Sequence, residues 1–131
     1  MAGLTPEQRQ LFTDKNFVAI STIGKDGSPR ATIVWVDAEG DEIIVNGASS
    51  RGWIKNLRRN PHVALTIYDH AQPYRRVTVI GEAVEMTTEG GEENIDELSM
   101  KYGGRPYPDH QPDNPRVIVR IRPDTVTSMG V

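Results

Sequence analysis

The sequence contains no cysteine. Disulfides, zinc–thiolate sites and a cysteine nucleophile are therefore excluded, and a redox role would require a bound cofactor. No apolar run approaches the ~20 residues that a membrane-spanning helix needs, and no basic segment followed by an apolar stretch stands at the N-terminus. We therefore expect no membrane association and no secretion signal, and these absences favour a cytoplasmic protein.

Positive charge is scarce overall but concentrated in one place. The net charge of −3 at pH 7 argues against a nucleic-acid-binding protein. Residues 51–60 nevertheless contain Arg51, Lys55, Arg58 and Arg59 and no acid, whereas residues 82–97 contain acids and no base. The basic cluster is the feature that most needs an explanation.

Side chains that perform chemistry directly are also few. The three histidines have no metal-binding spacing, and the Gly-x-Ser-x-Gly motif of serine hydrolases is missing. The acids between residues 92 and 97 are typical of the water-facing side of a helix. We expect neither a metal site nor a catalytic side chain, so an enzyme with this sequence would depend on a cofactor.

The chain length of 131 residues suits one domain over residues 1–131. A capping box at Thr5 predicts a short helix that stops near Asp14. Gly81 indicates a bulge or bend inside a strand, and Pro123 should close the last strand. The pattern predicts strands over 17–23, 31–36, 42–46, 62–68, 74–87 and 117–121, and further helices over 51–60 and 89–102. Short turns between these strands favour a β-rich α+β domain with one antiparallel sheet that closes on itself.

Residues 46–55 run from a strand end, through small polar residues, into a helix N-terminus. Such an N-terminus presents unpaired N–H groups and a partial positive charge. Arg51 and Lys55 share one helix face, and Ser49 and Ser50 add hydroxyl groups. The segment predicts a phosphate site, so alanine at Arg51 or Lys55 should weaken ligand binding. The alternative is that the basic side chains form a solvated helix face.

Aromatic residues are few, so their positions carry information. Trp53 and Tyr102 are consistent with packing of a helix face. Trp35 stands at a strand end and Tyr107 in a proline-rich loop, where packing explains them less readily. A flat ligand ring needs apolar or aromatic surface beside it, which these two residues could provide.

Several segments, taken in order, resemble the flavin-binding split-barrel superfamily, the pyridoxamine-phosphate-oxidase-like proteins. Within it the sequence resembles the small F420-dependent oxidoreductases. The likeness covers about residues 5–126. The segments that carry it are 16–22 with 24–29, 34–37, 56–61 with 63–65, 73–76 with 81–83, 101–104 and 116–123.

The resemblance implies a six-stranded antiparallel split β-barrel with short peripheral helices, as a homodimer with two cofactor sites at the subunit interface. The phosphate end of the cofactor would lie by the loop before the basic helix, and its ring against the strand at residues 32–35. Trp53 stands where many relatives carry a second basic residue. The residues that the resemblance assigns to cofactor binding are Thr32, Ile33, Val34, Trp35, Asn46, Ala48, Ser49, Ser50, Arg51, Trp53, Lys55 and, from the partner subunit, Tyr74.

The resemblance also implies an activity, with alternatives left open. The first interpretation is hydride transfer between coenzyme F420 and a small organic acceptor. The second is an FMN enzyme of the same fold, and the third is a non-catalytic protein that binds a flavin or F420. Arg58 and Arg59 favour the longer anionic tail of F420 over the single phosphate of FMN.

Overall fold

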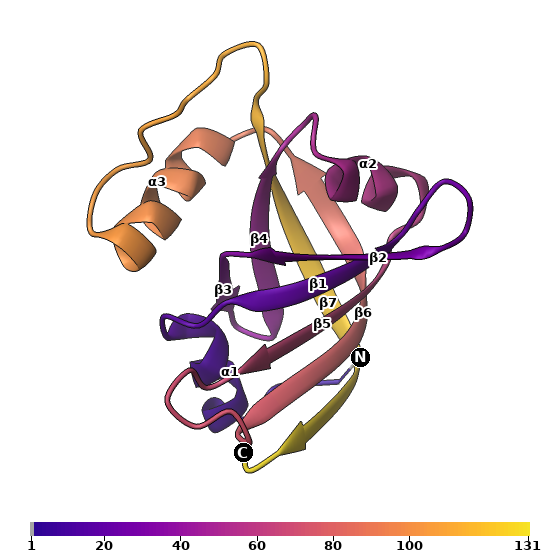
Figure 1. Cartoon of the computed structure of the whole chain (residues 1–131), viewed down its shortest axis with the longest axis vertical. Helices are drawn as coiled ribbons and strands as arrows, with labels where there is room; N and C mark the ends of the chain where they lie inside the picture. Colours follow the sequence, from indigo (N-terminus) through magenta and orange to yellow (C-terminus); the bar gives the residue numbers. More distant parts are fainter. Residues whose placement is uncertain (1) are drawn as a thin grey trace.

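The computed structural model describes residues 2–131, within which three helices surround one seven-stranded sheet (Figure 1). The helices are α1 (Pro6–Thr13), α2 (Gly52–Arg59) and α3 (Gly91–Gly103). The strands are β1 (Val18–Ile23), β2 (Pro29–Val34), β3 (Val36–Glu39), β4 (Glu42–Ala48), β5 (His62–Tyr68), β6 (Arg76–Thr87) and β7 (Arg116–Met129). No helix between residues 2 and 131 has the length and apolar content to cross a membrane.

The sheet is antiparallel throughout, in the order β2-β1-β5-β6-β7-β4-β3. Its two outer strands, β2 and β3, follow one another in the chain and are separated only by Trp35. The sheet must therefore curl until its edges approach each other, which produces a half-barrel (Figure 1). The described strands include no pairing of β2 with β3, so the barrel stays split at this seam.

The expected number of strands, six, is wrong: the described residues form a sheet of seven strands. Residues 31–36 were expected to form one strand, but the chain turns at Trp35. The residues before it pair with β1 and those after it pair with β4. Residues 31–36 contain no glycine or proline that would mark this corner. The corner arises from the closure of the sheet, which local sequence does not reveal. The turn between β3 and β4 consists of Gly40 and Asp41.

Strand β7 corrects a second expectation, since it passes through Pro123 and ends at Met129. The ladder skips Asp124, so that Pro123 lies opposite Gly81 and Thr125 opposite Ile80. A proline is tolerated at such a bulge because the ladder is already interrupted there. The predicted irregularity at Gly81 is confirmed, and a Cβ at this position would collide with the carbonyl oxygen of Arg122.

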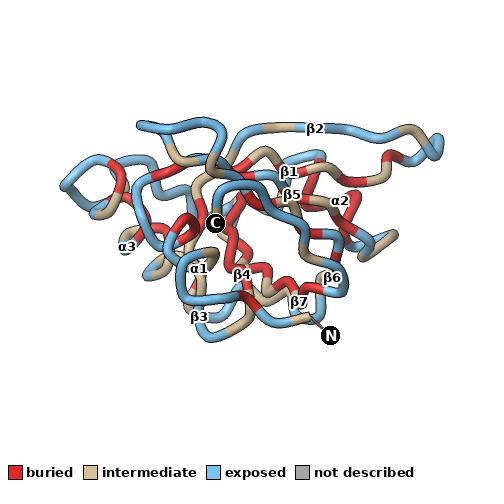
Figure 2. The backbone as a smooth tube through the Cα atoms, turned by 90° about the horizontal axis from the view of Figure 1, so that it is seen from below, coloured by how far each residue is buried: buried red, intermediate tan, exposed pale blue. Residues whose placement is uncertain are grey.

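The expected helices are present, with ends close to those predicted. Thr5 and Gln8 form the capping box of α1, and Asp14 is its C-cap. Helix α3 ends at Gly104, which adopts a left-handed conformation. The interior of the half-barrel is filled by the inward-facing residues of the strands, together with one face of α1 and of α2 (Figure 2). Prominent among them are Phe12, Ile20, Ile43, Ile54, Leu57, Leu65, Ile67, Val119 and Ile121.

Candidate functional site

Two adjoining cavities lie between α2 and the seam of the barrel. The first has a volume of about 350 Å³ and the second about 280 Å³. Arg51 and Trp53 line both of them. The two cavities therefore adjoin at these two residues.

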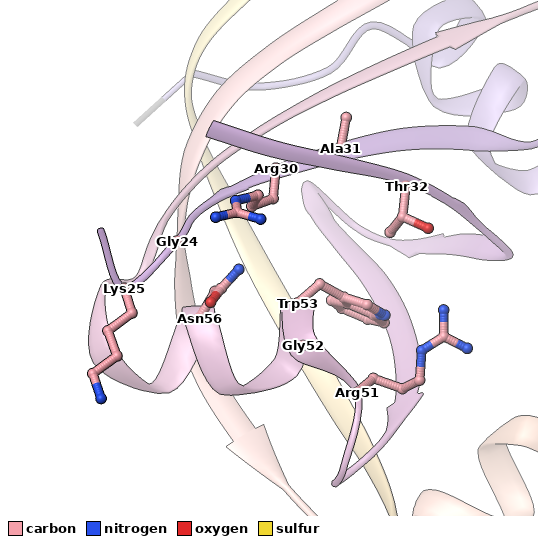
Figure 3. A pocket seen from close by; sticks show the side chains of 9 residues that line it. All are labelled: Gly24, Lys25, Arg30, Ala31, Thr32, Arg51, Gly52, Trp53 and Asn56. Carbon is pink, nitrogen blue, oxygen red and sulfur yellow. The ribbon is translucent and has the colours of Figure 1, made fainter. Parts of the chain in front are cut away.

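The first cavity is polar and basic. It lies between β2 and α2, where Arg30 and Thr32 face Trp53 and Asn56 while Lys25 points away (Figure 3). Arg51 is the N-cap of α2 and makes no side-chain capping hydrogen bond. Arg51 therefore adds a full positive charge next to the unpaired N–H groups of the first helical turn. This arrangement suits an anionic group.

The second cavity is largely apolar and opens at the seam. Ile33 and Val34 belong to β2, Trp35 is the corner residue, and Asn46 and Gly47 belong to β4. The remaining lining residues are Phe17, Arg51, Trp53, Ile95, Tyr107 and Arg116. Aromatic and aliphatic walls with two arginines are typical of a site for a flat anionic ligand.

The corner at Trp35 is held by the C-terminal part of α3. Its indole stacks on Tyr102, with ring centroids 5.2 Å apart and an interplanar angle of 5°, and contacts Tyr107 edge to face at 6.3 Å. The Tyr102 hydroxyl accepts the Val36 N–H at 3.2 Å and donates to the carbonyl of Asn16. Lys101 Nζ donates to the Val36 carbonyl at 2.6 Å. These contacts fix one wall of the second cavity.

Burial changes the acid–base properties of the two α3 residues that hold the corner. It raises the pKa of Tyr102 to about 12, so this hydroxyl stays neutral and continues to donate. Burial also lowers the pKa of Lys101. Both side chains are committed to backbone groups, which makes them structural rather than catalytic.

Asn46 carries an unsatisfied hydrogen-bond acceptor beside the second cavity. Its Nδ2 donates to the Gly91 carbonyl at 2.9 Å and to Asn94 Oδ1 at 3.0 Å, which fixes the orientation of the amide. Asn46 is 7% exposed, and its Oδ1 is the one buried side-chain polar atom without a partner among the described residues. A buried acceptor is costly when unpaired, so this atom suits a ligand N–H or O–H donor.

The structure brings together seven of the twelve residues predicted for cofactor binding, at the lining of the two cavities. These are Thr32, Ile33, Val34, Trp35, Asn46, Arg51 and Trp53. Trp53 is 7% exposed and also belongs to the hydrophobic core. The packing role expected for this residue therefore holds, and it does not prevent one face from lining the site.

The five other predicted residues lie outside these linings. Ser49 Oγ donates to the Pro115 carbonyl at 2.6 Å, and Ser50 Oγ accepts from Asn114, so both hydroxyls are engaged. Ala48 precedes them at the end of β4. Lys55 lies in a neighbouring basic depression. Tyr74 is 71% exposed in the loop after β5, at the end of that strand far from α2.

Sequence reasoning missed several residues of the site. Arg30 on β2 and Lys25 in the turn before it both line the first cavity, although the Lys25 side chain points away from it (Figure 3). The second cavity is also lined by Phe17, just before β1, by Ile95 of α3 and by Arg116 of β7. Nothing in local sequence spacing places these residues together, because the curling of the sheet and the docking of α3 do so.

Two of the α3 acids are not simply water-facing, contrary to the expectation for residues 92–97. Glu92 and Asp96 each accept from His110 at 2.8 Å. Glu92 also accepts the N–H of Arg116 at 2.7 Å, and Asp96 that of Tyr107 at 2.9 Å. His110 therefore has a structural role, because it clamps the loop 104–115 onto α3. The described chain contains no group of three or more such side chains placed to hold a metal.

The clamp should depend on pH. Hydrogen bonds to Glu92 and Asp96 raise the pKa of His110 above its ordinary value of 6.5, and the bond from His110 lowers the pKa of both acids below 4.5 and 3.8. The histidine contribution to stability is full below pH 6.5 and is lost as pH rises through the raised pKa. The carboxylate contributions are present above 4.5 and 3.8 and are lost on acidification.

The expected result is that the loop is most rigid between pH 4.5 and 6.5. Hydrogen-exchange protection factors of the Tyr107 and Arg116 amides, corrected for intrinsic exchange, should fall as pH rises above this window. His110→Gln should remove that dependence. An identical pH profile in the variant would show that His110 does not control the loop.

Comparison with known proteins agrees with this architecture. The profile of the family described as pyridoxamine 5'-phosphate oxidase matches residues 4–130. No curated protein matches the chain in sequence.

Solved structures supply the second comparison. A structure named F420 Reductase superposes with a TM-score of 0.84 at 22% identity, covering 95% of this chain and 98% of that one. A conserved hypothetical protein from Mycobacterium tuberculosis gives 0.74 at 26% identity, covering 98% and 86%. A Listeria innocua protein with the proposed assignment pyridoxamine 5'-phosphate oxidase gives 0.69 at 18%, covering 92% and 93%. At 22% and 18% identity, the first and third show a shared fold only.

The resemblance inferred from the sequence is thereby confirmed at the level of the superfamily. The family profile spans almost all of the described residues, and the half-barrel with its split seam is the fold that the resemblance implied. The chain belongs to the pyridoxamine 5'-phosphate oxidase family.

Proposed function

We propose that this protein is an F420-dependent oxidoreductase that transfers a hydride between the deazaflavin and a small organic acceptor. The observation that carries the proposal is the pair of cavities that meet at Arg51 and Trp53, one basic and one apolar. A flavin-type cofactor has the same division into an anionic end and a flat ring. Family membership and the neighbour named F420 Reductase support this interpretation.

The residues present fit such a cofactor. Arg51, with the first N–H groups of α2, would hold its phosphate. Arg30 lines the same cavity but is paired with Asp26 at 3.2 Å, so its charge is already partly neutralised. The ring would lie in the second cavity beside Trp35, where the unpaired Asn46 Oδ1 can accept the ring imide N–H. Bound there, the deazaflavin supplies the hydride chemistry. None of the side chains in the site is placed as an acid or base. The contribution of the protein would therefore be to orient the ring and to exclude water.

The preference for F420 over FMN rests on a basic depression that continues from the first cavity. Lys55, Arg58 and Arg59 line it, together with Lys25, and it has no acidic lining residue. Lys25, Gly52 and Asn56 belong to both linings, so the depression adjoins the first cavity. The single phosphate of FMN would not reach this far, whereas a long anionic tail could cross it.

Titrations of F420 and FMN, followed by ligand fluorescence, test the proposal. We expect F420 to bind with a dissociation constant of about 1 μM or lower and FMN more weakly. The double variant Lys55→Ala/Arg58→Ala should weaken F420 binding roughly 3- to 30-fold and leave FMN affinity unchanged, because exposed charge–charge contacts each contribute about 1 kcal/mol or less. Lys15→Ala, an exposed cation next to β1, is the control.

The opposite outcome has a clear meaning. Tighter binding of FMN, or an equal loss for both ligands in the double variant, would contradict the tail assignment and favour an FMN protein. F420 binding without oxidation of the reduced cofactor by any acceptor in a broad screen would favour a non-catalytic binding protein. The non-catalytic alternative is tested because the site contains no catalytic side chain.

We further propose a homodimer in which the partner subunit covers the seam and contributes its Tyr74. Ile33 on β2 and Ile80 on β6 are 63% and 51% exposed, and large apolar side chains on a sheet face commonly mark an interface. Sedimentation should give twice the mass of the chain. Tight cofactor binding by a monomer would contradict this part of the proposal. The cytoplasmic location stays a prediction from the sequence.

A further inference from the structure

Arg116 is a cation that the cofactor proposal leaves unused. It is half-buried at the start of β7 and lines the second cavity. Arg51 and Arg116 are the only charged residues in that lining, and neither forms an ion pair within residues 2–131. Glu92 lies close enough for the charge of Arg116 to lower its pKa, yet no carboxylate within residues 2–131 forms a direct ion pair with the guanidinium. If Arg51 holds the cofactor phosphate, Arg116 is the cation left for a second anionic group.

The position of Arg116 is fixed by contacts on three sides. Its backbone N–H donates to Glu92 at 2.7 Å, and its carbonyl oxygen lies so close to Gly91 that a Cβ there would collide with it. Its guanidinium lies 4.5 Å from the centre of the Tyr107 ring. Its Nη2 also donates a hydrogen bond to the Tyr107 hydroxyl at 2.6 Å. The cation is therefore held in place before any ligand arrives.

A purely structural role does not account for this arrangement. The guanidinium has five N–H donors, and the structure gives it one acceptor, the Tyr107 hydroxyl. The carboxylates of Glu92 and Asp96 bind backbone N–H groups and His110 instead of the guanidinium. A planar guanidinium with free donors on a cavity wall matches the two oxygens of a carboxylate.

We propose that Arg116, oriented by Tyr107, binds a carboxylate of the electron acceptor, and that the acceptor is a flat conjugated carboxylic acid. This inference rests on the proposed function, because it assigns Arg51 to the cofactor and leaves Arg116 to the second substrate. With the cofactor ring beside Trp35, the apolar part of the acceptor would lie against Phe17 and Ile33, which line the same cavity. Arg116 is a specificity residue in this account, not a catalytic one.

The test compares 2-naphthoate with its neutral isostere 2-naphthamide, measured by calorimetry on the cofactor-loaded protein. We expect naphthoate to bind at least about tenfold more tightly, as for one charge-assisted hydrogen-bonded pair. Arg116→Gln should remove the preference, and Tyr107→Phe should reduce it. Arg105 is an exposed arginine in the loop that contains Tyr107, and Arg105→Gln should retain the preference for naphthoate.

Each outcome decides the inference. Equal binding of the two probes, no binding of naphthoate, or a preference that survives in Arg116→Gln would overturn it. A loss of F420 affinity in Arg116→Gln, with no change in the naphthoate preference, would assign the residue to the cofactor instead. If the protein binds neither F420 nor FMN, the proposed function fails, and the same comparison on the unloaded protein still decides whether Arg116 selects carboxylates.

Discussion

Replacement of Arg51 by alanine is expected to weaken F420 binding by about 1–3 kcal/mol, roughly 5- to 150-fold in dissociation constant. Arg51, like Trp53, lines both cavities, and it is the N-cap residue of α2. Its loss removes a full positive charge from the point where the N–H groups of the helix already favour an anion. Affinity is measured by quenching of ligand fluorescence.

Two controls make this result specific. Lys15→Ala removes an exposed charge far along the chain from α2 and should leave affinity unchanged. Arg51→Lys keeps the charge but loses the planar fork, so its effect should be intermediate. Unchanged affinity in Arg51→Ala would mean that the basic face of α2 is only solvated, which is the alternative reading of residues 51–60.

Replacement of Gly91 by alanine is expected to lower the free energy of unfolding by roughly 1–3 kcal/mol, the usual cost of overpacking. The reason is steric, because a Cβ at Gly91 would overlap the carbonyl oxygen of Arg116, and backbone cannot move aside as a side chain can. Gly91 does not have a positive φ, so conformational strain plays no part. Urea denaturation monitored by circular dichroism gives the value.

The matched control for this substitution lies in the same helix. A Cβ at Gly103 would meet no atom within 4 Å, so Gly103→Ala should be neutral or slightly stabilising. If the two variants unfold at the same urea concentration, close contact between α3 and β7 is not important for stability. Because that contact also positions Arg116, Gly91→Ala should in addition reduce the naphthoate preference.

Features that depend on nearby residues could be predicted from the sequence. The capping box at Thr5 and the strand at 62–68 follow from local chemistry, and the structure confirms both. Gly81 signalled an irregular strand correctly because only glycine fits so close to the neighbouring backbone. The anion site before α2 could be proposed because charge and helix start lie within a few residues of each other.

Features that depend on closure of the sheet could not be predicted. The corner at Trp35 exists because β2 and β3 lie at opposite edges of the sheet order, and no local signal marks it. Arg116 was given no role of its own beyond the segment 116–123, since its cavity is completed by residues from β2, β4 and α3. Pro123 was wrongly predicted to end the strand, because the bulge at Asp124 that accommodates it is visible only in the pairing of β6 with β7.

The most direct test of the central claim uses the two tryptophans of the chain, Trp35 and Trp53, which both line the second cavity. Their two indole N–H signals can be followed by NMR in ¹⁵N-labelled protein during titration with F420. The account predicts that both signals shift and saturate at one F420 per chain, and that FMN produces the same shifts only at higher concentration. Binding of F420 that moves neither indole signal would place the cofactor elsewhere and contradict the account.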